Sequence, residues 1–568
     1  MTFLSLRAPE EHGALLIQPP PQEWPNIVAS NAQLFRRLSL RFCDIPLKHW
    51  RAATQRLARA WAGQQLARWG LRAIVPDAPC LVTGHQPELF HPGVWAKHFA
   101  LAEACQSLGL APVNLIADHD QPKTLSLRVP TQINHRLSVT WIPVCELRPG
   151  LAWEEYVLLT DDISANGNRS VGVHQESPNQ DGWVRDSPCS ATHLLTLSQR
   201  AETALADLLP DTILPQFVSQ AGHFLNLHKP KCRLADVLAG VRRHWEERWG
   251  YHNGELYVST LCESEGFMAF TGEVLRQLPR FVTMHNMELM AFRKEEGLRS
   301  RTHPVPPLGQ DGDWHEAPFW VWQDGQPRQR LWARCSPHSW TLRIGETGPC
   351  AEIRPVLDQE GLHEWKQALK TAGWKIRPRA LTLTLFVRLF LAEMFIHGIG
   401  GGLYDRFTDR LLQRYWEVPA PQYAVVSATL RLPLPCPSKP TWVREQLLHR
   451  MRDCQYNPER VLPRELLSLP EVRRSVIRKQ ELLNRWSGAN REQRRELHRE
   501  FSEIREVLRP LTLDVERQLR SALQTLADYE TQLRLVRDRE WAFVLYSDQA
   551  LTYLVERIRQ EFGGLRHS

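Results

Sequence analysis

Residues 78–130 read APCLVTGHQPELFHPGVWAKHFALAEACQSLGLAPVNLIADHDQPKTLSLRVP, and this stretch decides the fold. An apolar run over residues 80–83 stops at Gly84, and a second apolar run covers residues 113–117. Between them, apolar side chains recur at roughly helical spacing from residue 92 to residue 109. The order predicts a strand, a helix and a second strand, which together form one βαβ unit.

Polar residues follow both predicted strands. The first strand leads into Gly84-His85-Gln86, and the second leads into Asp118-His119-Asp120. Open parallel sheets bind their ligands beyond the carboxyl ends of the strands and near helix N-termini. We therefore look for a functional site at these two segments first.

The first polar segment favours recognition of a phosphate or a carboxylate. Gly84 allows the backbone to approach a ligand, and His85, Gln86 and His91 add hydrogen-bond donors. Two alternatives stay open, namely a metal site and ordinary loop histidines, although the helix-borne HExxH spacing is absent. His98, which lies inside the predicted helix, is interpreted as an ordinary buried histidine.

The second polar segment has two interpretations. A carboxylate at a strand end can serve as a general base toward an amine or a thiol, and neighbouring acids favour the charged form of a histidine. Acidic strand ends also occur as solvated turns, so both interpretations stay open for Asp118, His119 and Asp120. The motifs GxxxxGK[ST], GxGxxG and GxSxG are absent, which argues against the usual phosphate-loop, dinucleotide-binding and hydrolase classes.

The composition is that of a folded globular protein with several domains. The chain has 568 residues, 43% of them apolar and 23% charged, and a formal charge of +7. That charge is small for the length, so we expect no nucleic-acid partner. The 11 cysteines are scattered without a CxxC pair, and the N-terminus lacks the apolar core of a secretory signal. These features favour the reducing cytoplasm over a disulfide framework.

The most hydrophobic segment, residues 380–399, resembles a membrane-spanning helix only in its average hydrophobicity. Arg388, Glu393 and His397 interrupt it, and a bilayer would have to accommodate all three at a cost of several kcal/mol. A core helix fits better, and no membrane partner is expected.

The pattern along the chain predicts an α/β protein with a divided nucleotide-binding-like core. Prolines and glycines between residues 303 and 325 predict a loop in the middle of the chain. The predicted parts are a helical layer (1–75), the first half of the core (76–150), inserted α/β subdomains (151–350), the second half of the core (351–435), a helical coiled-coil arm (436–540) and a return segment (541–568).

The predicted second half of the core contains one long apolar helix and a strand. The helix covers residues 380–396 and ends at a glycine run that includes Gly400, Gly401 and Gly402. Such a run is either a plain break or a cradle of backbone amides for an anion, and the break is favoured. The strand covers residues 423–428.

The helical part near the C-terminus carries a long apolar stripe. From Leu497 to Val536 leucines and other apolar residues recur at steps of three and four, which is typical of a coiled coil. Residues 487–490 predict a turn with Asn490 as the helix N-cap, and Pro510 should break the second helix. The stripe must be covered by the first helix or by a second subunit, and we expect both, hence a homodimer.

Three segments resemble the putative cysteine ligases of bacillithiol synthesis, the BshC family. Residues 83–90, TGHQPELF, are similar to the family's TGQQPGLF motif. Residues 116–120, IADHD, are similar to the IA-x-EDHD motif at the end of one of the family's strands. Arg377-Pro378 before an apolar segment that ends in glycines is similar to the family's RP…GG segment, and the charged helices near the C-terminus match its helical arm.

The resemblance implies a Rossmann-like core with inserted connecting subdomains and a C-terminal coiled-coil arm used for dimerisation. The implied reaction is amide formation between cysteine, or a similar amino acid, and the amino group of a glucosaminyl-malate-like molecule, in the synthesis of a low-molecular-weight thiol. The cofactor stays open, with a nucleotide such as ATP or ADP as the candidate. Two other functions compete, a nucleotidyltransferase on the same fold and a non-catalytic coiled-coil scaffold with a vestigial pocket.

The resemblance also implies roles for individual residues. Asp118, His119 and Asp120 would orient or deprotonate the amine. The implied substrate-binding residues are Thr83, Gly84, His85, Gln86, His91, Arg377, Gly400, Gly401 and Gly402.

The chain departs from the family pattern inside the implied pocket. His85 replaces the family's glutamine, residues 91–95 read HPGVW where the family has GGPLY, and the nearby lysine is displaced to Lys97. Because function lives in the site rather than in the scaffold, the substrate is less firmly implied than the fold.

Overall fold

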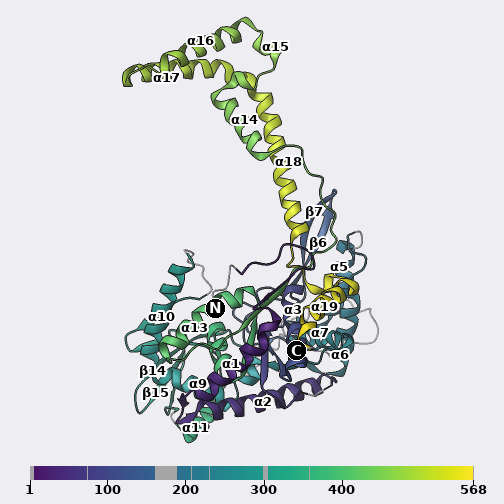
Figure 1. The fold of residues 1–568 in the computed structure, drawn as a ribbon, viewed down its shortest axis with the longest axis vertical. Coiled ribbons are helices and arrows are strands. Elements are labelled where there is room, and N and C mark those ends of the chain that lie inside the picture. Colours follow the sequence, from purple (N-terminus) through teal and green to yellow (C-terminus); the bar gives the residue numbers. More distant parts are fainter. Residues whose placement is uncertain are drawn as a thin grey trace, which may run out of the picture. The chain divides into compact units, whose positions relative to one another are not determined.

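The computed structural model describes residues 6–72, 75–159, 189–205, 208–228, 230–297, 305–356 and 358–566 (Figure 1). The chain divides into two compact units, which we describe separately. Unit 1 comprises residues 1–129, 139–432 and 539–568, and unit 2 comprises residues 130–138 and 433–538. Both contain helices, but the large sheets belong to unit 1.

The central sheet of unit 1 has six strands in the order β1-β19-β18-β4-β5-β11. Five of them run parallel, and β1 pairs antiparallel with β19 at one edge. When the parallel strands are numbered along the chain, their spatial order is 3-2-1-4-5, so the direction of winding reverses between β4 and β18. The strands are β1 (Leu15–Gln18), β4 (Cys80–His85), β5 (Ala111–Ile116), β11 (Gly254–Tyr257), β18 (Ala392–His397) and β19 (Ala424–Ala428).

The predicted βαβ unit is confirmed. β4 leads through a loop into α3 (Pro92–Leu108), and β5 follows in parallel register beside β4. His91 caps the N-terminus of α3 by accepting a hydrogen bond from the amide of Gly93 (3.1 Å), and Gly109 ends the helix in the left-handed region at φ +65°. The strand extends two residues further than expected and includes Gly84 and His85.

The predicted helix over residues 380–396 is wrong in its second half. The helix α12 ends early (Ala380–Phe390), and the following residues form the strand β18, which is followed directly by α13 (Ile399–Tyr415). All six residues of β18 are buried. A strand buried on both faces is continuously apolar, so periodicity cannot separate it from an adjoining apolar helix. Gly398 therefore joins the strand to α13, and Gly400, Gly401 and Gly402 lie in the first turn of that helix.

The middle of the chain supplies both a core strand and an antiparallel sheet. β11 lies in the central sheet although it falls within residues 151–350, which we had assigned to inserted subdomains. The antiparallel sheet has the order β12-β13-β14-β15-β16, with β17 beside β13. Its strands are β12 (Gln310–Asp311), β13 (Trp314–Gln323), β14 (Gln329–Cys335), β15 (Trp340–Ile344), β16 (Cys350–Ile353) and β17 (Trp374–Pro378).

The loop predicted for residues 303–325 is wrong where β13 forms. The sequence WHEAPFWVWQ is rich in aromatic residues, which favour strands. Its Pro318 lies where the register with β14 shifts between Glu316 and Trp320, and a β-bulge tolerates a proline.

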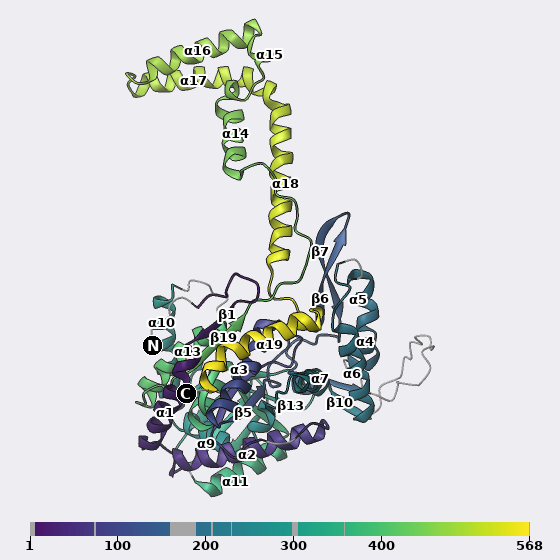
Figure 2. The same ribbon diagram turned by 45° about the vertical axis from the view of Figure 1, so that its right-hand side comes forward.

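Helices pack around the central sheet (Figure 2). Alternate residues of β4, Cys80 and Val82, belong to a large apolar cluster that includes residues of α2, α9 and α12. Helix α3 contacts β4, β5 and β19 and lies alongside α19. The helices of unit 1 also include α1 (Trp24–Arg37), α2 (Leu47–Arg68), α4 (Ala191–Leu195), α5 (Leu197–Leu205), α6 (Leu214–Leu227), α7 (Leu234–Arg248), α8 (Val258–Leu261), α9 (Glu265–Arg276), α10 (Leu278–Glu295), α11 (Gln359–Ala372) and α19 (Asp548–Gly563).

The shorter elements complete the fold. The strands β8 (Val157–Leu159), β9 (Cys189–Ser190) and β10 (Lys231–Arg233) form a small sheet, and β2 (Arg41–Phe42) pairs with β3 (Ile45–Pro46). The ribbon of β6 (Ser126–Ile133) and β7 (Arg136–Pro143) has its turn, residues 130–138, in unit 2. The short 3-10 helix η2 (Trp153–Glu155) follows this ribbon and is used below.

Unit 2 consists of paired helices. α16 (Pro470–Trp486) and α17 (Arg491–Leu508) form the predicted hairpin, with Asn490 as the N-cap of α17, and α14 (Arg444–Tyr456) packs beside α18 (Leu513–Arg537) (Figure 1). The 3-10 helix η4 (Arg509–Thr512) separates α17 from α18 at the predicted proline break. The short α15 spans Arg464–Leu467.

The predicted apolar stripe of unit 2 is divided between two clusters. Leu497, Ile504 and Leu508 pack with residues of α16, whereas Leu519 and Leu526 pack with residues of α14. Much of the stripe is thus covered by helices of its own chain.

Two findings concern membrane-spanning helices and cysteines. Among the described residues, no helix has both the length and the apolar character needed to cross a membrane. Cys145 is disulfide-bonded, in contrast to the expectation from the cysteine spacing, whereas nine cysteines of the described part of the chain are free thiols.

Candidate active site

The carboxyl edge of the central sheet gathers polar residues that follow or end its strands, among them the two polar segments singled out in the sequence. His85 ends β4, residues 118–120 follow β5, Ser259 follows β11, and His397 ends β18. Register places Gly84 beside Leu115, and His85 beside Ile116. The two polar segments of the βαβ unit therefore lie next to each other.

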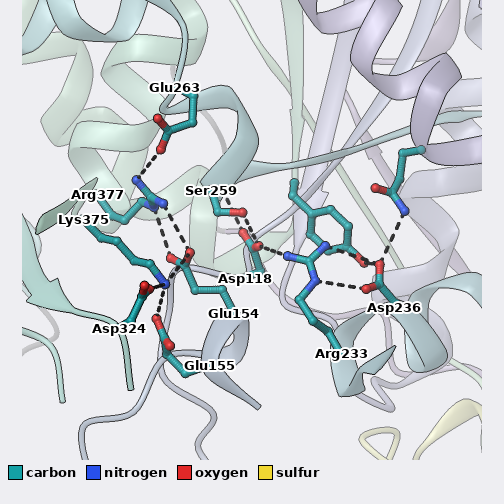
Figure 3. A network of polar contacts seen from close by, with 12 residues as sticks. Asp118, Glu154, Glu155, Arg233, Asp236, Ser259, Glu263, Asp324, Lys375 and Arg377 are labelled. Atoms are coloured by element: carbon teal, nitrogen blue, oxygen red, sulfur yellow. Dashed lines mark hydrogen bonds and ion pairs between the residues drawn. The ribbon is translucent and has the colours of Figure 1, made fainter. Parts of the chain in front are cut away.

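Asp118 is fully buried and ties β5 to the end of β11. Its carboxylate accepts hydrogen bonds from the Ser259 amide (2.9 Å) and the Ser259 hydroxyl, and lies 3.4 Å from the Arg233 guanidinium (Figure 3). Burial, reinforced by the Glu154 carboxylate, raises the pKa of Asp118 to about 6. These contacts occupy the carboxylate, so Asp118 organises the strand ends.

Arg377, an implied substrate-binding residue, lies in a network on the side of Asp118 away from Arg233 (Figure 3). Its guanidinium donates to both carboxylate oxygens of Glu154 (3.1 and 3.2 Å) and to Glu263 (3.3 Å). Lys375 reaches Glu155 at 2.6 Å. Glu154 and Glu155 belong to η2. The backbone of η2 is bonded to the Asp118–Asp120 segment, since the Glu154 amide donates a hydrogen bond to the Asp118 carbonyl (2.8 Å).

Of the two carboxylates in the segment 118–120, Asp120 is the one that solvent reaches. Its side chain is 38% exposed, pairs with Arg328 at 2.8 Å and accepts a hydrogen bond from the Gln86 amide. Burial acts against the charged form of Asp120, but the ion pair with Arg328 keeps the pKa of this carboxyl below its usual range. Asp120 is therefore ionised and held in place by two donors.

His119 is buried and uncharged. Its side chain is 3% exposed, and its Nδ1 has no hydrogen-bond partner in the described part of the chain. Burial lowers the pKa of His119 to about 4. An imidazole with this pKa is a weak base at neutral pH.

A cavity of about 400 Å³ opens beside the loop that follows β4. It contains two cations, Lys123 and Arg128, and two acids, Glu88 and Glu540, so its walls can bind groups of either charge. The lining residues are His85, Glu88, Leu89, Phe90, His91, Val94, residues 123–128, Trp141, Val144, Trp153, Leu238, Glu540 and Ala542.

Two of the implied substrate-binding residues line this cavity, and a third lies next to it in the chain. His85 and His91 both face it, and burial together with the nearby Lys97 ammonium lowers the pKa of His85 well below its ordinary value. Gln86 follows His85 and holds Asp120. Thr83 instead donates to the Ile396 carbonyl (2.7 Å) inside the sheet, which is a structural role.

The glycines at the start of α13 differ in their surroundings. A side chain at Gly402 would meet Val425 at 2.4 Å, so this glycine is needed for packing against β19. Gly401 lies against His397, and Gly400 has open space where a side chain would be. The structure places these glycines at the end of β18, one strand away from β4.

A buried cluster of His98, Glu246 and Glu255 has the atoms to hold a metal ion, since its ligand atoms lie within 4.8 Å of one another. Arg242, however, donates to Glu246 (2.6 Å) and to Glu255 (2.7 Å) and compensates their charge. Arg242 thus supplies the positive charge that a metal ion would bring, in line with the ordinary buried role predicted for His98. His98 Nε2 and one oxygen each of Glu246 and Glu255 have no hydrogen-bond partner among the described residues.

Comparison with known proteins adds no family. No protein-family model matches the chain, and no curated protein is detectably similar to it. The geometry of the site therefore carries the functional argument.

Several site residues were missed in the sequence. Arg328, Glu154 and Arg233 come from distant segments, and nothing near them in the chain marks them. Lys97, His397 and Arg388 did leave a signal, because each is an ionisable residue inside an apolar segment. Such residues are rarely buried without a partner or a function.

Proposed function

We propose that this chain is an amide-forming enzyme that joins cysteine, or a similar amino acid, to the amino group of a small polar molecule such as glucosaminyl malate. One observation carries the proposal. The Gln86 amide donates to the Asp120 carboxylate, so the two segments that resemble the cysteine ligases meet beside a cavity of about 400 Å³. Segments 34 residues apart thus share one site.

The topology supports a Rossmann-like core for this enzyme. The parallel strand order 3-2-1-4-5 has its switch point between β4 and β18, and sheets of this kind bind ligands at that point. We infer a nucleotide such as ATP or ADP as the activating cofactor, since a free carboxylate must be activated before an amine can attack it. The same topology favours nucleotidyl transfer as a second candidate function.

The roles of the site residues follow from their charges. Asp120 is ionised and fixed by Arg328, so we assign it to hold an N–H or O–H group of the acceptor. Lys123 and Arg128 suit the carboxylates of the acceptor, and neutral His85 adds a hydrogen bond. A mixed lining of this kind matches a ligand with both acidic and basic groups.

Compartment and assembly belong to the same proposal. The nine free thiols of the described residues favour a cytoplasmic enzyme of thiol synthesis, whereas the disulfide at Cys145 counts against a reducing compartment. A homodimer is no longer required to cover the apolar stripe, because α14 and α16 cover much of it. Light scattering of the purified chain measures its mass directly and decides between monomer and dimer.

The test is an assay of amide formation with cysteine, glucosaminyl malate and ATP, read by mass spectrometry of the product. D120N should lower kcat/KM by about 100-fold or more, because the neutral amide no longer attracts the acceptor. D77N is the matched control, since Asp77 is 94% exposed and its one ion pair is on the surface.

Three outcomes discriminate the candidates. An amide product that D120N abolishes and D77N retains supports the ligase. Release of pyrophosphate with a nucleotide-linked product and no amide supports nucleotidyl transfer. Absence of any product, together with no thermal stabilisation by cysteine, glucosaminyl malate or ATP, contradicts both and leaves a scaffold, because a bound ligand at about 100 times its Kd adds roughly 2.7 kcal/mol.

A further inference from the structure

His397 lies at the switch point between β4 and β18 and is held by a buried acid. It is the last residue of β18, is 4% exposed, and its Nε2 lies 2.8 Å from the Asp405 carboxylate. Asp405 in α13 is 1% exposed and is itself paired with Arg388 of α12 at 2.6 Å. Three elements thus fix one imidazole ring.

The arrangement defines which nitrogen carries the proton. Burial would raise the pKa of Asp405, but the Arg388 guanidinium and His397 hold it well below its usual range, so the carboxylate is ionised. An ionised carboxylate can only accept a hydrogen bond, so Nε2 of His397 carries a proton and donates a hydrogen bond to Asp405. In the neutral ring the lone pair is therefore on Nδ1. That nitrogen has no hydrogen-bond partner among the residues that the structure describes.

A glycine keeps the Nδ1 side of the ring open. A Cβ added at Gly401 would lie 2.9 Å from Nδ1, closer than real side-chain contacts, whereas a Cβ at Gly400 would meet nothing within 4 Å. Both glycines are exposed and belong to the first turn of α13. Access to Nδ1 therefore depends on the absence of a side chain at one position.

The other polar groups of the edge are poorly suited to accept a proton. Asp118 is occupied by Ser259 and Arg233, and burial lowers the pKa of His119 to about 4. Asp120 is a weak base because its ion pair lowers its pKa. His397 is the imidazole at this edge that has one nitrogen fixed by an acid and the other without a partner.

We propose that His397 is the proton acceptor of the amide-forming step, with Asp405 as its positioning residue. The amine nitrogen forms a bond to the carbonyl carbon of an aminoacyl phosphate or aminoacyl nucleotide. The phosphate or nucleotide leaves with the bonding electron pair, and the proton lost by the nitrogen passes to Nδ1 of His397. The role of His397 as proton acceptor rests on the proposed function, which supplies the substrate. The observation that its Nδ1 has no partner is independent of that function.

The geometry also limits the size of the acceptor. Asp120 follows β5 and His397 ends β18, with β4 between them. Two strand spacings are about 10 Å. The acceptor must therefore span β4, with one polar group on Asp120 and its amine at His397, as a sugar joined to a small acid can do.

The test compares two glycine variants of the full chain. G401A places a methyl group against Nδ1 and should lower kcat for amide formation by about 100-fold. G563A, at a glycine of α19 where an added Cβ would meet nothing within 4 Å, should stay within twofold of wild type. H397Q should match G401A, and the double variant H397Q/D405N should lose no more than H397Q alone, because Asp405 acts through the ring. Equal activities of G401A and G563A would overturn the assignment.

A second measurement is independent of activity. Diethyl pyrocarbonate modifies unprotonated imidazole nitrogens, and peptide mass spectrometry locates the modified histidines. His397 should be modified in wild type and G400A, and at least tenfold more slowly in G401A. If His397 reacts no faster than buried His98 in wild type, the open Nδ1 is refuted. If the reactivity pattern holds but no amide forms, the proposed function is wrong, whereas the accessibility of Nδ1 of His397 is confirmed.

Discussion

A single buried charge can make the stability of the folded protein depend on pH. Lys97 is 3% exposed, and its ammonium donates to the Gly84 carbonyl at 2.7 Å. Burial lowers the pKa of Lys97 to about 7, whereas the unfolded chain keeps the ordinary value of 10.5. Between these values the unfolded chain binds more protons than the folded one, so stability rises with pH.

This linkage gives a prediction for K97M. From pH 7 to pH 10 the wild type should gain stability relative to K97M, with a slope of up to about 1.4 kcal/mol per pH unit. Below pH 7 the difference between the two proteins should be constant. Urea unfolding at several pH values measures it, and K370M, which changes an exposed lysine, should show no such slope. Parallel pH profiles of wild type and K97M would contradict the lowered pKa.

Which site residues could be predicted depends on the distance along the chain. His85, Gln86 and Asp120 follow strands that the local pattern reveals, so their meeting at one sheet edge followed from the sequence. Arg328 reaches Asp120 from 208 residues away. No local pattern encodes such a contact, because it depends on how distant segments of the chain come together in the fold.

At the scale of elements, caps were easier to predict than buried strands. The turn before α17 carries a short polar signal, and Asn490 accepts hydrogen bonds from Glu492 (3.1 Å) and Gln493 (3.0 Å) as expected. β18 carries no such signal, since it is apolar and follows an apolar helix directly. Its only marks are Glu393 and His397, which pair with Arg51 and Asp405 in the fold.

The cap of α17 can be tested by N490A. The substitution removes the side-chain oxygen that accepts hydrogen bonds from the amides of Glu492 and Gln493, and it should destabilise the start of the helix by about 1 kcal/mol. Amide hydrogen exchange in residues 491–494 should accelerate about fivefold, while exchange in α14 stays unchanged. N484A, the same change at an exposed position inside α16, is the control and should not accelerate exchange in α17. Equal protection in N490A and wild type would show that tertiary contacts alone hold the helix end.

At the scale of the whole molecule, the residues of the proposed site and the paired helices belong to different units. Every residue that lines the cavity belongs to unit 1, as do Asp120, His397 and Asp405. Unit 2 has its own apolar clusters, one around Leu482, Leu497 and Leu508 and one around Leu519 and Leu526. Stability and activity should therefore respond to different substitutions.

A leucine pair in unit 2 tests this separation. Leu508 is fully buried, so L508A should destabilise unit 2 by about 2–5 kcal/mol, whereas L513A, at a residue that is 58% exposed, should change it by less than about 0.5 kcal/mol. Hydrogen exchange of residues 470–508 reports the difference. Amide-forming kcat/KM should stay within twofold of wild type in both variants, because no described lining residue of the cavity comes from unit 2. A loss of activity in L508A that L513A does not share would mean that unit 2 takes part in the reaction, and the site would then have to be extended beyond the sheet edge.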